Sequence, residues 1–98
     1  MPIDDAAFAA SPLAVMLPPA LVRLFPGSTR RVEVSATTVD DMIGALDRRW
    51  PGMRDRLCDS TPRLRRHINI FVAGERATLA TRLAPGSTVT ILTAISGG

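Results

Sequence analysis

Four stretches of the chain show the hydrophobic pattern of β-strands. Residues 13–17 form a continuous apolar run bounded by two prolines, whereas residues 30–35, 67–72 and 88–93 alternate between apolar and polar side chains. A period of two places successive side chains on opposite faces of a sheet. We therefore predict one strand in each of these four stretches.

One stretch shows the pattern of an amphipathic helix. Thr38 is followed three residues later by Asp41, a spacing typical of a helix N-cap, and Asp40 adds a second acid near the positive helix end. Pro51 and Gly52 end the pattern. We predict a helix that begins at Thr38 and buries one apolar stripe. The stripe consists of Val39, Met42, Ile43, Leu46 and Trp50.

The connecting segments are short or irregular. A Pro-Gly turn at 25–28 joins the first two strands, and residues 53–58 are predicted to form a short helical turn before a loop at 59–63. After a turn at 73–75, residues 78–83 form either a short strand or an irregular crossing segment.

The order strand, strand, helix, strand, short element, strand predicts an α+β domain with a mixed sheet packed on one main helix. The first and last strands are the most apolar, so we expect them to be central and adjacent. With a right-handed crossover through the helix, this is the β-grasp (ubiquitin-like) arrangement. We predict a flexible N-terminal extension at 1–12, the β-grasp domain at 13–93 and a flexible C-terminal diglycine tail at 94–98.

Composition and the N-terminal sequence indicate the cellular compartment. A chain of 98 residues with 46% hydrophobic content builds one modest core, and its apolar runs are too short to span a bilayer. The N-terminus has no basic residue before Arg23, unlike a secretory signal. We therefore expect a cytoplasmic protein with no membrane partner.

The charge is positive but not concentrated. The net charge is +3, all 12 residues of the Lys and Arg type are arginines, and only the segment 63–66 clusters them. Four aromatic residues are too few for an evident base-stacking platform, so we expect no nucleic-acid partner. Because the chain contains no lysine, no side-chain amine in it can accept an isopeptide bond.

The single cysteine, Cys58, cannot form an internal disulfide, and together with the single histidine, His67, it cannot make a zinc site of the usual type. We expect Cys58 to pack as a small apolar residue rather than to act as a catalytic thiol, and we expect no metal site.

Three segments resemble a known family. Residues 38–46 fit its helix, residues 71–75 fit its third strand and turn, and residues 85–98 end in Thr-Ala-Ile-Ser-Gly-Gly directly after the last predicted strand. Over 13–98 the chain resembles the ubiquitin-like sulfur carriers of the MoaD and ThiS type. It is most similar to the CysO-type carriers of cysteine biosynthesis, although Thr93 stands where many relatives carry proline.

The resemblance implies that the chain is a carrier and not an enzyme. An E1-like adenylyltransferase would use ATP to adenylate the Gly98 carboxylate, and a sulfur donor would convert it to a thiocarboxylate. Gly97 and Ser96 would belong to the tail that enters the partner. No cofactor would be bound by the chain itself, and the sulfur acceptor would be an enzyme of the cysteine synthase type.

The resemblance also suggests contact residues and leaves alternatives open. Phe71 points outward if Ile68 and Ile70 face the helix, so it either contacts a partner or is covered by the extension or a loop. Arg66 and Arg82 either complement an acidic partner or are simply solvated. The chain could instead be the small subunit of molybdopterin synthase, paired with its large subunit, a ubiquitin-like protein modifier, or a plain binding domain.

Overall fold

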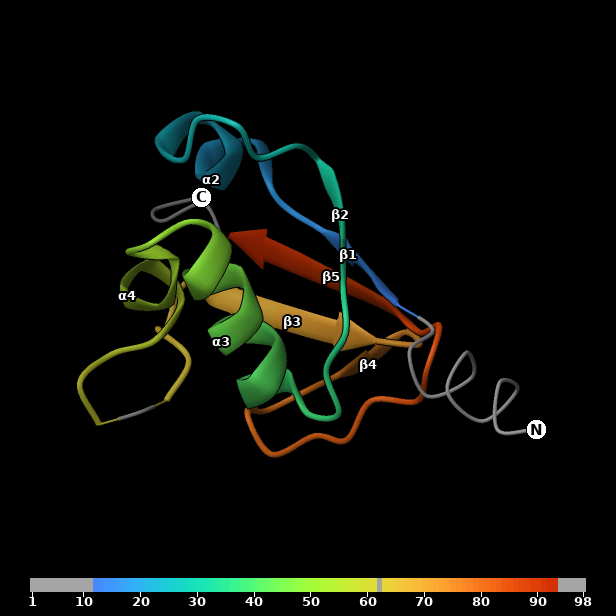
Figure 1. Cartoon of the computed structure of the whole chain (residues 1–98). Coiled ribbons are helices and arrows are strands. Elements are labelled where there is room, and N and C mark those ends of the chain that lie inside the picture. The colour runs from blue at the N-terminus through green and yellow to red at the C-terminus, as the bar shows by residue number, and fades with distance from the viewer. Residues whose placement is uncertain (1–11, 62, 94–98) are drawn as a thin grey trace.

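Residues 12–61 and 63–93 are described by the computed structural model, and they form a mixed sheet with α3 and α4 on one face (Figure 1). Residues 1–11 of the predicted extension and the predicted tail at 94–98 lie outside the described residues. The elements in chain order are β1 (Leu13–Met16), α2 (Pro19–Leu24), β2 (Arg31–Val34), α3 (Val39–Arg49), α4 (Met53–Leu57), β3 (Ile68–Val72), β4 (Glu75–Arg76) and β5 (Thr88–Thr93).

The sheet confirms the predicted β-grasp topology. Its strand order is β2-β1-β5-β3-β4, in which β1 and β5 run parallel and every other neighbouring pair is antiparallel. The two most apolar strands are therefore adjacent, as expected, and β5 is the central strand. Because α3 and α4 lie between β2 and β3 in the chain, they cross one face of the sheet.

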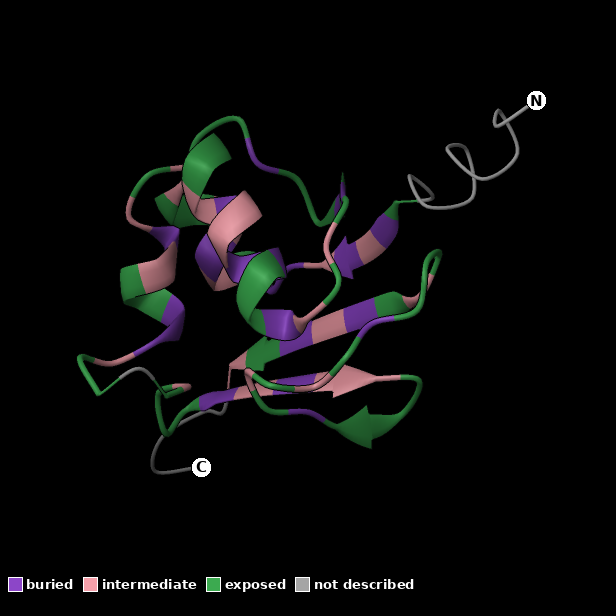
Figure 2. Ribbon diagram, turned by 60° about the horizontal axis from the view of Figure 1, so that its bottom comes forward, coloured by how far each residue is buried: buried purple, intermediate pink, exposed green. Residues whose placement is uncertain are grey.

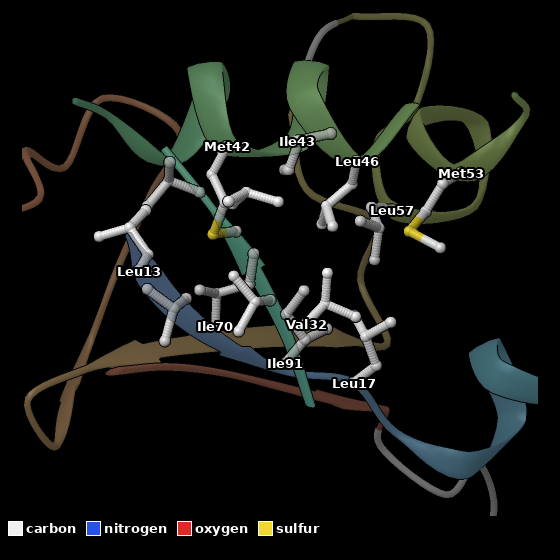
Figure 3. Packing of buried hydrophobic residues seen from close by; sticks show 14 of the residues in the cluster. Leu13, Leu17, Val32, Met42, Ile43, Leu46, Met53, Leu57, Ile70 and Ile91 are labelled. Carbon is white, nitrogen blue, oxygen red and sulfur yellow. The ribbon is translucent and has the colours of Figure 1, made fainter. Parts of the chain in front are cut away.

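The hydrophobic core lies between this face and the helices. Burial alternates along β3 and β5, so that Ile70 and Ile91 are almost completely buried while their chain neighbours are more exposed (Figure 2). Figure 3 shows Met42, Ile43 and Leu46 of α3 pointing toward these two side chains. Full burial of one such side chain contributes about 1.5–3 kcal/mol, so this layer carries most of the stability of the domain.

The main helix begins and ends as predicted. The Oγ1 atom of Thr38 accepts a hydrogen bond from the backbone N of Asp41 at 3.1 Å, which satisfies one free donor of the first turn. At the other end, Trp50 is the C-cap residue and packs, half-buried, against the core. The Arg49 guanidinium lies over the Trp50 ring, 4.6 Å from its centre, in a cation–π contact.

The connection from β1 to β2 contains a helix that the sequence analysis did not predict. The two prolines after β1 were expected only to end the strand, but Pro18 is the N-cap of α2 and Pro19 is its first residue. Proline suits the first helical turn because its missing N–H would have no intrahelical partner there. Leu21 of α2 is buried and joins the core.

The short edge strand β4 lies earlier in the chain than residues 78–83, the segment in which the sequence analysis allowed a short strand. β4 comprises Glu75 and Arg76, directly after a turn in which Ala73 and Gly74 have positive φ angles of 52° and 83°. The segment 78–83 is the irregular crossing alternative, with a single bridge between Arg82 and Thr38. The short helical turn predicted at 53–58 is confirmed as α4.

Candidate functional site

The chain leaves the sheet from its central strand. β5 pairs with β1 over residues 88–90 and with β3 over residues 89–93, and its last described residue, Thr93, pairs with Ile68. Val89 and Ile91 are buried beneath α3, so the strand is held on one face along its length and on both edges in its first half. The predicted site residues Ser96, Gly97 and Gly98 lie outside the described residues and begin three positions after Thr93 in the chain.

The outer face of the sheet, which points away from α3, carries a row of side chains that includes Met16 and Phe71. Met16 pairs with Thr90, Thr90 with Phe71, and Phe71 with Arg76, so these four side chains lie side by side across four strands. Phe71 is half-buried and does not pack against the core cluster. Its outward orientation is therefore as predicted, and its role as a partner contact stays a prediction.

Sequence reasoning missed two apolar members of this face. Leu92 pairs with Asn69, the residue two positions before Phe71, and it is 46% exposed. The alternation of β5 could have revealed Leu92, because this residue lies between Ile91 and Thr93, which both face inward. Met16 lies in a continuous apolar run that gives no such signal. We call Met16, Phe71, Thr90 and Leu92 the outer patch.

The two predicted arginine contacts lie away from the outer patch and from each other. Arg66 is exposed in the turn before β3, closed by a hydrogen bond from the backbone N of Ile68 to the carbonyl of Arg65. Arg82 is exposed beside the start of α3, where its backbone bridges to Thr38. Only Arg66 therefore lies near the end of β5, and the three predicted contact residues do not form one continuous surface.

The segment between α3 and β3 is held by a set of polar contacts. Asp47 of α3 accepts hydrogen bonds from the backbone N atoms of Gly52 and Arg54, both at 3.0 Å, and so caps the start of α4. The side chain of Arg54 donates a hydrogen bond to a second acid of α3, Asp40, at 2.9 Å. This hydrogen bond raises the pKa of Arg54. Gly52 has a φ angle of 101°, which favours glycine at this tight turn.

The loop that follows α4 is ordered in a similar way. One carboxylate oxygen of Asp59 accepts hydrogen bonds from both the backbone N and the hydroxyl of Thr61 and from the backbone N of Arg63. These bonds favour the charged carboxylate and lower the pKa of Asp59. The carboxylates of Asp47 and Asp59 thus fix parts of the backbone between α3 and β3.

Cys58 is buried and free, which confirms that it packs as a small apolar residue. Burial raises the pKa of its thiol, so the thiolate that a nucleophile needs is disfavoured. Among residues 12–61 and 63–93, no group of three or more His, Cys, Asp or Glu residues could hold a metal ion.

The helices in the described part of the chain are all too short or too polar to cross a membrane.

Comparison with known proteins gives consistent matches. The model of the ThiS family matches residues 19–98. The sulfur carrier protein CysO of Mycobacterium tuberculosis (strain ATCC 25618 / H37Rv) is 37% identical over 86 residues, which cover 82% of this chain and 92% of that protein.

Solved structures share the fold. A chain from the crystal structure of the Amycolatopsis orientalis BexX/CysO complex is 31% identical with a TM-score of 0.76, covering 88% of this chain and 99% of that chain. The small archaeal modifier protein SAMP1 from Haloferax volcanii is 28% identical with a TM-score of 0.75, covering 89% of this chain and 99% of that one.

Proposed function

The chain belongs to the ThiS family, and from this premise we propose that it is a sulfur carrier whose Gly98 carboxylate becomes a thiocarboxylate that supplies sulfur for cysteine biosynthesis. The observation that carries the proposal is that the family match runs through Gly97 and Gly98, directly beyond the central strand β5. The 37% identity to a protein named sulfur carrier CysO, over most of both chains, supports the same client.

The proposed chemistry explains why the tail needs these residues. A carboxylate is a poor electrophile, so an E1-like partner first joins the Gly98 carboxylate to the α-phosphate of ATP and releases pyrophosphate. A sulfur donor then displaces AMP and leaves the thiocarboxylate. Glycine lacks a β-carbon, so Gly97 and Gly98 fit a narrow channel. Six extended residues from Thr93 reach about 20 Å, enough to enter a partner's active site.

The carrier itself supplies the platform and not the catalysis. ATP is used by the activating partner, and the sulfur is accepted by a second enzyme, of the cysteine synthase type in this proposal. The outer patch is the contact that we assign to the activating enzyme, because Phe71 and Leu92 expose apolar area beside the strand that leads into the tail. We expect neither nucleic acid nor membrane as a partner.

A second candidate is a ubiquitin-like protein modifier that is joined through Gly98 to amines of other proteins. The likeness to a small archaeal modifier protein favours it, with 28% identity and a TM-score of 0.75. The lysine-free sequence restricts such conjugation to other proteins or to the N-terminus of the chain. The small subunit of molybdopterin synthase shares the thiocarboxylate chemistry and differs only in its acceptor, the large subunit.

Intact-mass measurement tests the proposal. The protein is incubated with ATP, sulfide and the E1-like enzyme of the same organism, and we expect a gain equal to the exchange of one oxygen for sulfur. A variant lacking Gly98 is the matched control and should show no gain. Branched peptides on lysines of added proteins would instead favour the modifier. An unchanged mass, with an enzyme active on another carrier, would sink the thiocarboxylate proposal.

A further inference from the structure

A cleft of about 610 Å³ opens between the end of α2 and the connection from α3 to β3. Its walls come from the end of α2, the turn between α3 and α4, α4 itself and the residues before β3 (Figure 1). We call it the basal cleft. The lining side chains that carry the following argument are Leu24, Phe25, Asp55, Arg56, Arg65 and His67.

The basal cleft is positively charged and part of that charge is fixed in place. The Nε atom of Arg65 donates a hydrogen bond to the backbone carbonyl of Asp55 at 2.7 Å, which orients the guanidinium and leaves its terminal nitrogens available. Arg56 is exposed and makes no hydrogen bond or ion pair within the described part of the chain. Asp55 is the single acid of the lining, so the two arginines exceed it in charge.

The cleft also has an apolar rim. Leu24 is 48% exposed at the end of α2, and Phe25 lies beside it, half-buried against the core. An exposed leucine next to available guanidinium groups suits a protein surface that combines an acidic side chain with an apolar neighbour.

The position of the cleft connects it to the tail. Thr93 pairs with Ile68, the residue that follows His67, so the chain leaves the sheet next to the cleft wall. Thr93 shares the inward face of β5 with Ile91, and α4, which lines the cleft, lies on this side of the sheet. A protein that approaches the end of β5 from this side of the sheet therefore meets the basal cleft, whereas one that approaches from the opposite face meets the outer patch.

The outer patch and the basal cleft differ in how freely their sequences can change between related carriers. The outer patch is made of sheet strands, whose alternation is fixed by the core on their other face. The basal cleft is made, apart from Leu24 and Phe25, of the connection between α3 and β3, which contributes no strand to the sheet. Such a connection can change between carriers without disturbing the fold, so it suits a contact that distinguishes one client enzyme from another.

We propose that the basal cleft docks an acidic side chain of the sulfur-accepting enzyme, at the rim of the opening that receives the tail. The inference rests on the proposed function and names the surface by which the acceptor recognises this carrier. Arg56 and Arg65 form the charged contact, and Leu24 contributes the apolar contact beside it.

The test separates activation from transfer. The thiocarboxylate form is prepared with the E1-like enzyme, purified, and mixed with the cysteine synthase-type acceptor of the same organism, and both rates are followed by intact mass. For Arg56→Glu we expect the ratio of transfer rate to activation rate to fall about tenfold relative to wild type. Leu24→Ser should lower the same ratio about threefold. Wild-type transfer should slow with added salt, and the Arg56→Glu variant should be less salt-sensitive.

Arg48→Glu is the matched control, because it makes the same charge change at an exposed position of α3 that does not line the basal cleft. It should leave the ratio at the wild-type value, and circular dichroism checks that all variants fold. An unchanged ratio in Arg56→Glu, or an equal fall in Arg48→Glu, overturns the proposal. Absence of any thiocarboxylate defeats the proposed function itself. If the wild-type thiocarboxylate transfers no sulfur to the acceptor, that enzyme is not the partner of the basal cleft, and the proposal is overturned.

Discussion

Ile70 and Phe71 are neighbours in β3, yet their side chains lie on opposite faces of the sheet. Ile70 is completely buried beneath α3, whereas Phe71 is half-buried and lies outside the core cluster. The same alternation separates Ile91 from Leu92 in β5. Stability and recognition can therefore be assigned to different side chains one position apart, and substitutions in adjacent residues can test this division.

The largest effect on stability is expected on the inner face. Ile70→Ala leaves a cavity in a layer where neighbouring side chains are fully buried, and it should lower the free energy of unfolding by about 3 kcal/mol. Urea denaturation measures the change. Ile70→Val removes a single methylene and should cost about 1 kcal/mol. Equal small losses for both variants would mean that the inner face is less tightly packed than its burial indicates.

The adjacent substitution should have the opposite profile. Phe71→Ala should change the free energy of unfolding by less than about 1 kcal/mol and slow thiocarboxylate formation about tenfold, because an aromatic side chain at an interface contributes strongly to binding. Activation assays across a range of carrier concentrations should place the loss in apparent affinity. Arg48→Ala, an exposed change on α3, is the control and should leave activation intact. A normal activation rate for Phe71→Ala would remove the outer patch from the activating interface.

The contrast between these faces also separates what the sequence predicts from what it does not. β2, β3, β5 and α3 follow from local patterns, since period-two alternation and the Thr38 cap are properties of neighbouring residues. α2 was missed because its prolines end one element and begin another, and only six residues follow the N-cap. Surface clefts are harder to predict than single elements. The basal cleft is lined by both Leu24 and His67, which are far apart in the sequence, so no local pattern indicates that they lie close together.

A smaller effect is expected where one polar contact fixes the helix that covers the inner face. Thr38→Ala removes the acceptor for the backbone N of Asp41 and should cost about 1 kcal/mol. Thermal unfolding should show this as a decrease of about 4–8 °C in Tm for a domain of this size. Thr38→Ser keeps the hydroxyl and should recover most of the loss. If the serine variant is as unstable as the alanine variant, packing of the methyl group and not capping is responsible.

The smallest effect is the pH dependence of stability that the buried thiol of Cys58 causes. At neutral pH this dependence is absent, because the thiol is protonated in both the folded and the unfolded chain. Burial raises the pKa of Cys58 in the folded state above the unfolded value of about 8.5, so the unfolded chain loses its thiol proton first. The stabilisation is fully present below this unfolded value and is lost as the pH rises through the folded pKa. The chain has no lysine or tyrosine, and arginine stays charged, so few other groups titrate in this range.

Urea unfolding at a series of pH values from 7 upward checks this expectation. The free energy of unfolding of the wild type should decline above about pH 8.5, whereas that of Cys58→Ala should remain nearly level because its core position no longer titrates. A lower starting value of the alanine variant does not affect the comparison, since only the slope against pH is diagnostic. Parallel declines in both proteins would assign the alkaline loss to the N-terminal amine and show that the inner layer around Cys58 admits water.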